Sequence, residues 1–441
     1  MSHVFGRFTN LVLPTVVRGD GPYLFDADGK RYLDACGGAA VSCLGHSEPR
    51  VARAIADQLA RVSYASTVFF TSEPAERLAD ELVREAPAGL TRVFFGSGGS
   101  EQVDGTLKLA RQYFLAKGEP LRTRFISRRQ SFHGNTLGAL GITGNVKRRE
   151  PYLPLIVDAE RIAPCYAYRG RAANETDEAY GLRVANELEA ALRRVGPETV
   201  IGFVAETVVG ATLGAVPPVP GYFRRIREIC DQHGILLILD EIMSGMGRTG
   251  VRFACAEDGV APDLLVLAKG LGAGFQPISA TLATETIYRT IQSVHGSVVH
   301  GHTYQAHPVA CAAALAVQEV IRDDDLIANV RRRGESLERR LREALGAHPH
   351  VGDIRGRGLF WGVEFVEDRA TKRPFPADGA LGWKLSRAGM GHGVMLYPGT
   401  GTMDGLSGDH LILAPPYNVT EGQLDEMVTG MVATVHELLG R

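Results

Sequence analysis

The chain has 441 residues, 45% of them hydrophobic and 22% charged, and its formal net charge at pH 7 is −2. This composition is typical of a globular protein with more than one domain, and the small net charge gives no electrostatic argument for nucleic acid or an anionic membrane as a partner. The six cysteines form no CxxC pair, so we expect no metal site. No stretch reaches membrane-spanning length and "MSHVFGRFTN" has no apolar signal core, so we expect a cytoplasmic protein.

The predicted elements divide the chain into three parts. In residues 1–60, "PYLFDADGKRYLDA" predicts a hairpin, and we assign this part to a small domain. In residues 61–320, the expected large domain, helical and strand-like segments alternate. Amphipathic spacing predicts helices over 72–86, 100–114 and 221–234. Apolar runs predict strands over 92–95, 124–129, 201–207, 235–241, 264–269 and 278–284.

Strands that are apolar throughout and separated by helices predict an α/β fold with a largely parallel sheet, covered by helices on both faces. The pattern changes after residue 320, where a long amphipathic helix over 326–346 precedes strand-like runs at 358–366 and 410–416. We therefore expect residues 321–441 to complete the smaller α/β domain begun by residues 1–60.

Four ionisable residues stand where predicted strands end: Glu206, Asp240, Glu241 and Lys269. In an open parallel sheet, ligands bind beyond the carboxyl ends of the strands, so a site is expected there. Lys269 closes an apolar run and is followed by a glycine-rich loop. Alone, it is more simply a solvated strand end than a desolvated amine kept for chemistry, because buried lysines are rare.

Three further features bear on that choice. "FFGSGGSEQ" places glycines and the expected helix cap Ser100 where backbone N–H groups bind anions, although a tight turn alone would also explain it. A buried Asp240 needs a cation, which a pyridinium, a metal or an arginine could supply. Phe132 and His133 offer a flat ring for stacking. An anion site, a ring, a buried carboxylate and a lysine together meet the needs of pyridoxal 5'-phosphate.

Several segments resemble those of the class III (subgroup II) aminotransferases, enzymes of fold type I that use pyridoxal phosphate on a mostly parallel seven-stranded sheet. The segments are "GSGGSEQVDGTLKLARQY", "SFHGNTLGALGITG", "FVAETVVGATLGAVPPVPGYF", "ILDEIMSGMGRTG", "DLLVLAKGLGAGFQPISA" and "HGHTYQAHPVACAAALA". The resemblance covers nearly the whole chain, and "YPGTG" with "GDHLILAPP" is similar to the ω-amine branch of the family.

The resemblance implies a role for each matching residue. Lys269 is expected to form the Schiff base and to shuttle the proton, and Asp240 to keep the pyridine nitrogen protonated. Phe132 and Ile242 are expected to pack on the two ring faces.

The remaining cofactor contacts are expected to come from Gly99, Ser100, His133, Glu206 and Thr303. Thr303 is expected to reach the phosphate of the neighbouring subunit, which implies a homodimer with shared sites. Tyr64 falls where the family places substrate-pocket residues, although a surface tyrosine would look the same in the sequence.

The chain departs from the family pattern at four places. Thr207 replaces a proline, Gln102 an alanine, and Met243 a glutamine that some members carry. Members that bind an α-carboxylate carry an arginine three residues before "PP", where this chain has Ile412. The donor is therefore expected either to lack an α-carboxylate or to meet an arginine from elsewhere in the chain.

The expected reaction is the ping-pong transfer of an amino group from an amine or ω-amino donor to a keto acid, pyruvate or 2-oxoglutarate. The alternatives are an aminomutase, racemase or decarboxylase on the same fold, a nucleotide-dependent oxidoreductase, and a non-catalytic dimeric scaffold. No GxGxxG motif is followed by an acidic residue after the next strand, which speaks against the oxidoreductase, and four strand-end ionisable residues speak against the scaffold.

Overall fold

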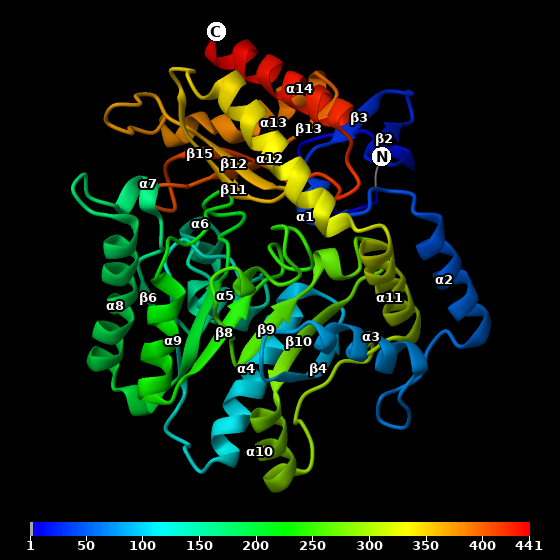
Figure 1. The fold of residues 1–441 in the computed structure, drawn as a ribbon, viewed down its shortest axis with the longest axis vertical. Helices are drawn as coiled ribbons and strands as arrows, with labels where there is room; N and C mark the ends of the chain where they lie inside the picture. The colour runs from blue at the N-terminus through cyan, green and yellow to red at the C-terminus, as the bar shows by residue number, and fades with distance from the viewer. Residues whose placement is uncertain (1–2) are drawn as a thin grey trace.

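A computed structural model describes residues 3–441 and has a seven-stranded sheet at its centre (Figure 1). The strand order is β4-β10-β9-β8-β7-β5-β6. The strands are β4 (Leu90–Gly96), β5 (Arg124–Arg128), β6 (Glu160–Ile162), β7 (Val200–Glu206), β8 (Leu236–Asp240), β9 (Leu264–Leu267) and β10 (Ser279–Thr284). Only β10 is reversed, since it pairs antiparallel with both β4 and β9. The predicted α/β fold with a mostly parallel sheet is confirmed.

The central strands are buried because their alternate side chains enter two separate apolar clusters. Leu237 and Leu239 of β8 pack into the cluster formed with α8 (Asp177–Val195) and α9 (Tyr222–His233). Ile238, between them, packs into the cluster formed with α4 (Gly99–Ala116) and α10 (Glu285–His295). This alternation explains why the strand is apolar at every position.

Gln102, one of the departures from the family pattern, joins the first two strands of this sheet. Its buried amide nitrogen donates to the Phe94 carbonyl at 2.9 Å and to Thr281 Oγ1 at 2.5 Å, and Ser279 Oγ donates to its amide oxygen at 3.1 Å. The side chain therefore satisfies polar groups of both β4 and β10 inside the core.

A second sheet lies above the first in Figure 1 and has the order β11-β12-β15-β14, with every pair antiparallel. Its strands are β11 (Val351–Arg357), β12 (Phe360–Phe365), β14 (Tyr397–Thr400) and β15 (Asp409–Leu413). The helices α12 (Leu326–Leu345), α13 (Leu381–Gly391) and α14 (Glu421–Leu439) share an apolar cluster with it.

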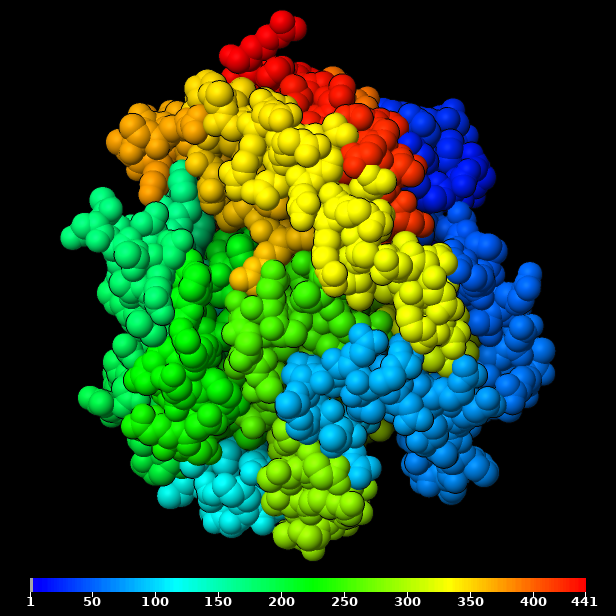
Figure 2. Space-filling view, viewed as in Figure 1, coloured from blue at the N-terminus to red at the C-terminus, as the bar shows by residue number. Residues whose placement is uncertain are grey.

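The N-terminal strands β1 (Val16–Asp20), β2 (Tyr23–Asp26) and β3 (Arg31–Asp34) form a meander, and the predicted hairpin is β2–β3. Strand β13 (Val394–Met395) joins this meander parallel to β3. The N-terminal segments accordingly lie against the C-terminal ones in the space-filling view (Figure 2). The domain boundaries at residues 60 and 320 stay a prediction.

The other helices connect or cover these sheets. They are α1 (Gly37–Ala40), α2 (Pro49–Arg61), α3 (Glu73–Arg84), α5 (Leu137–Ile142), α6 (Val146–Arg149), α7 (Ala167–Gly170) and α11 (Pro308–Asp323). Within residues 3–441, no helix combines the length and the apolar character that crossing a membrane requires.

Candidate active site

A cavity of about 410 Å³ opens at the carboxyl ends of the central strands. Because β5, β7, β8 and β9 run parallel, the loops that follow them meet at the same edge of the sheet. The predicted site residues that line the cavity are Gly99, Ser100, Phe132, His133, Glu206, Asp240, Ile242 and Lys269. The structure thus brings together eight of the ten residues that the sequence indicated.

Asp240 ends β8 and is only 5% exposed. One carboxylate oxygen accepts a hydrogen bond from the Ile242 backbone N–H at 3.0 Å, and the other lies 2.9 Å from His133 Nδ1. Since an ionised carboxylate only accepts hydrogen bonds, His133 Nδ1 carries the proton in this contact. The His133 ring therefore satisfies one oxygen of Asp240 and fixes the carboxylate at the cavity wall.

Lys269 follows β9 with a left-handed backbone, φ +43°. Among residues 3–441, none accepts a hydrogen bond or forms an ion pair with its amine within 4 Å. Burial lowers the pKa of the Lys269 amine to about 8; the charges of Asp240 and Glu206 oppose this shift, and that of Arg148 adds to it. The cavity therefore holds an amine that is neutral in a large fraction of molecules near pH 8, the form that attacks a carbonyl carbon.

Glu206, at the end of β7, is also buried against the cavity. Burial raises the pKa of its carboxyl to about 7, although His133 and Arg128 work in the opposite direction. Its oxygens accept from the backbone N–H groups of Phe132 at 3.4 Å and Gly210 at 3.3 Å, and Arg128 lies 4.0 Å away. Glu206 can therefore hold or release a proton near neutral pH.

The glycine-rich loop leads into α4, but the predicted helix cap is wrong. The helix begins at Gly99 with Gly98 as its N-cap, and the Ser100 hydroxyl accepts from the Asn135 backbone N–H at 3.1 Å. A Cβ atom on Gly99 would lie 3.0 Å from Ile242 Cδ1, so the glycine allows that isoleucine to approach the loop. The start of an 18-residue helix at the cavity wall is suited to binding an anion.

Tyr64 and Thr303 do not line the cavity of their own chain. Both are exposed, and the Tyr64 hydroxyl donates to the Thr303 carbonyl at 3.0 Å. The structure joins these two predicted residues to each other, on the surface.

Glu241 is the strand-end carboxylate that turns away from the cavity. It accepts hydrogen bonds from the Thr207 hydroxyl at 2.9 Å and from the backbone N–H groups of Ala254 and Cys255, both at 2.7 Å. Neighbouring residues at the end of a strand face opposite sides, so Asp240 and Glu241 cannot both enter the site. Thr207, which replaces the family proline, supplies one of these bonds.

The cavity wall also contains residues that the sequence did not single out. They are Val41, Ser97, Gly134, Asn135, Val208, Gln276, Pro277 and Ile278, with neighbouring backbone, and they are joined by Met243, which the sequence marked as a departure from the family pattern. Val208 and Met243 belong to an apolar cluster with Ile412, which makes one side of the cavity hydrophobic. Proximity to Glu206 in the chain could have indicated Val208, whereas nothing in the sequence distinguishes Val41.

Comparison with known proteins identifies the family. The model of the class-III aminotransferases matches residues 7–435. The chain belongs to the class III aminotransferase family. An uncharacterized aminotransferase of Schizosaccharomyces pombe is 47% identical over 435 residues, covering 98% of this chain and 95% of that protein.

Solved structures agree with this aminotransferase fold. An (S)-enantioselective ω-transaminase from Thermomicrobium roseum has a TM-score of 0.93 and 35% identity, with coverage of 99% of this chain and 96% of that one. The ω-transaminase of Pseudomonas jessenii, determined in complex with PMP, has a TM-score of 0.93 and 31% identity, with the same coverage. The fold is therefore that of fold type I transaminases.

Class III aminotransferases depend on pyridoxal phosphate, and the residues of this cavity fit that cofactor. The Lys269 amine, which has no partner among residues 3–441, can take a carbonyl carbon, and the buried carboxylate of Asp240 can face a pyridinium. The start of α4 can take a phosphate. This aminotransferase therefore has, in one cavity, each kind of group that the cofactor requires.

Proposed function

We propose that this aminotransferase transfers the amino group of an amine or ω-amino donor to a keto acid, pyruvate or 2-oxoglutarate, in two half-reactions. The observation that carries the proposal is the Lys269 amine, without a hydrogen-bond partner among residues 3–441, in the same cavity as the His133-supported Asp240. The structural likeness to ω-transaminases and the apolar wall that includes Met243 favour amine donors.

When bound, pyridoxal phosphate supplies a carbonyl carbon that carries the amino group and a ring that accepts electron density from the reacting carbon. Lys269 would hold it covalently, and its released Nζ would take the proton from the substrate carbon. Asp240 would keep the ring nitrogen protonated. Phe132 and Ile242 would pack against the two ring faces.

Other residues would hold the rest of the cofactor. The start of α4, at Gly99 and Ser100, would bind its phosphate. His133 would support Asp240 from behind, and Glu206 would lie near both the cofactor and the substrate.

The experiment has two parts. Borohydride reduction of the holoenzyme followed by peptide mass analysis should locate the cofactor on the peptide that contains Lys269, and Lys269→Ala should abolish the adduct. The donor amine alone should then change the cofactor absorbance stably, and a keto acid should reverse the change. Labelling at another lysine, or more than one equivalent of product per active site formed from the donor without a keto acid, would contradict the proposal.

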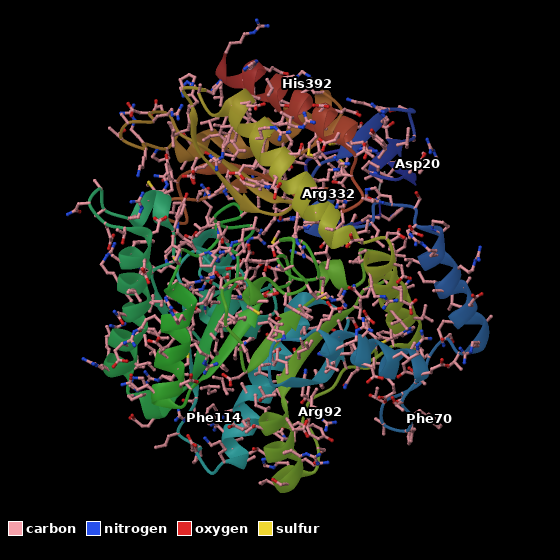
Figure 3. The ribbon with its side chains drawn as sticks, in the orientation of Figure 1. Asp20, Phe70, Arg92, Phe114, Arg332 and His392 are labelled. Carbon is pink, nitrogen blue, oxygen red and sulfur yellow. The ribbon has the colours of Figure 1, made fainter. Side chains whose placement is uncertain are left out.

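We also propose a homodimer in which Thr303 contacts the phosphate in the partner's site and Tyr64 contacts its substrate. Large apolar side chains are exposed on the segment that carries Tyr64 and on that around Thr303: Val62, Val68, Phe69, Phe70, Val299 and Tyr304. Phe70 projects at the edge of the molecule in Figure 3. An exposed apolar surface of this kind is typical of a subunit interface.

A cytoplasmic location is part of the same proposal. All six cysteines are free and buried, as in a protein kept in reducing conditions.

A further inference from the structure

Arg148 is a cation beside the cavity that has no carboxylate partner in the described part of the chain, residues 3–441. It lies on the short helix α6, and its guanidinium carbon is 4.5 Å from the centre of the Phe132 ring. Among residues 3–441, no carboxylate comes within 4 Å of this guanidinium. Two other arginines do have a carboxylate partner: Arg128 lies 4.0 Å from Glu206, and Arg149 pairs with Asp158.

The surroundings of Arg148 are partly closed to water. Burial lowers the pKa of the guanidinium, the hydroxyl of Tyr397 raises it, and the charge of Arg7 lowers it further. An arginine remains charged in such a place, so a desolvated guanidinium without a counter-ion gains most from an incoming carboxylate. Arg148 lies outside the cavity lining, but the Phe132 ring that it covers is part of that lining, and its charge lowers the pKa of the Lys269 amine.

Ile412 occupies the position at which the family resemblance expects an arginine, and its apolar side chain cannot bind a carboxylate. Ile412 is buried in an apolar cluster with Val208 and Tyr397. Tyr397 pairs with Ile412 across β14 and β15, and it is also the residue whose hydroxyl reaches Arg148. Tyr397 therefore packs against the apolar cluster of Ile412 and also lies next to the Arg148 guanidinium.

We propose that Arg148 binds the carboxylate of carboxylate-bearing substrates, above all the keto acid, and so replaces the arginine that is missing at Ile412. This inference rests on the proposed function, whose second half-reaction requires a keto acid. A guanidinium over the Phe132 ring can offer two parallel N–H donors to a carboxylate, while a donor amine without a carboxylate would not contact it.

The test compares Arg148→Gln with Arg148→Lys and with Lys147→Gln, which removes an exposed charge from the same helix. In Arg148→Gln, we expect kcat/KM for pyruvate or 2-oxoglutarate to fall about 10- to 100-fold, mainly through KM. The half-reaction with a carboxylate-free amine, followed by cofactor absorbance, should change less than about 3-fold. Arg148→Lys should recover part of the loss, and Lys147→Gln should match the wild type.

A readout independent of turnover is the dissociation constant of propionate, measured by calorimetry on the holoenzyme. It should rise about 10-fold or more in Arg148→Gln. An unchanged propionate affinity, or an equal loss in both half-reactions, would overturn the role of Arg148. A wild type without any amine half-reaction would instead overturn the proposed function, and the propionate titration would still decide the role of Arg148.

Discussion

His133 Nδ1 lies 2.9 Å from Asp240 Oδ2, and both side chains are almost completely buried. The contact orients the carboxylate before any ligand arrives. His133 is therefore a positioning residue, acting through Asp240, since its own Nε2 has no hydrogen-bond partner among residues 3–441.

His133→Ala should weaken cofactor binding and lower kcat, each by about 10- to 100-fold, as is usual when the support of a key ligand is removed. His133→Asn should retain more activity, because an amide N–H can replace Nδ1–H. Cofactor affinity by fluorescence titration and steady-state rates measure the two effects. Equal losses in both variants would show that the ring itself, rather than its donor, is required.

The depressed pKa of Lys269 predicts the pH dependence of cofactor attachment. Below about pH 8 the amine of the apoenzyme is protonated and unreactive, and above it the neutral form predominates. The initial rate of pyridoxal phosphate incorporation should therefore rise with pH and level off above about 8. A rate still rising steeply at pH 10 would indicate an ordinary lysine.

Glu206 predicts a pH effect on stability with a defined sign. The folded pKa is about 7 against an ordinary value of 4.5. Between these values the folded apoenzyme holds the extra proton, so stability falls as pH rises through this window, by about 3 kcal/mol in total. In Glu206→Gln this part of the decrease should disappear. Melting temperatures of both proteins between pH 4.5 and 8 test it, and parallel curves would contradict the prediction.

Gln102→Ala should destabilise the fold although it restores the residue usual in the family. It would remove a hydrogen-bond partner from the Phe94 carbonyl, Thr281 Oγ1 and Ser279 Oγ. Thr281 keeps its contact with Thr106, so the cost of about 1–3 kcal/mol for each unsatisfied group falls on the other two. We expect a lower melting temperature with little change in KM. Gln102→Glu, of similar shape but charged, should be worse, and an unchanged melting temperature for Gln102→Ala would refute the assigned role.

Phe70→Glu should dissociate the proposed dimer. The side chain is 68% exposed in the single chain, and a charge buried there without a partner would oppose association. Light scattering after gel filtration should show monomers, and activity should fall with the dimer fraction. Leu438→Glu, a change at an exposed residue of α14, is the matched control and should remain dimeric.

The sequence predicts the sheet and the site best where they depend on residues that are close together in the chain. Continuous apolar runs identify β7, β8 and β9, and parallel strands bring their carboxyl ends to one edge, so Lys269 and Asp240 could be placed together. The reversal of β10 was not predicted, although the connection from β9, which holds only one 3-10 turn at Lys269–Leu271, is too short for a usual parallel crossover.

Other features depend on contacts between distant segments. Asp240 and Glu241 look equivalent in the sequence, and only the facing of their side chains separates a site residue from a structural one. The approach of Val41 and Arg148 to the cavity is fixed by tertiary packing, which no local pattern reports. The prediction of Ser100 as the N-cap of α4 was wrong because Gly98 can adopt the extended N-cap backbone as readily as a serine.

The pairing of β3 with β13 has a consequence for synthesis. Leu33 and Asp34 of β3 pair with Val394 and Met395 of β13. The fourth strand of the N-terminal sheet is therefore synthesised more than three hundred residues after the third. Closing a loop of this length is entropically expensive and comes late. The seven-stranded sheet can assemble during translation, whereas the meander beside it has an exposed edge that chaperones can protect until β13 arrives.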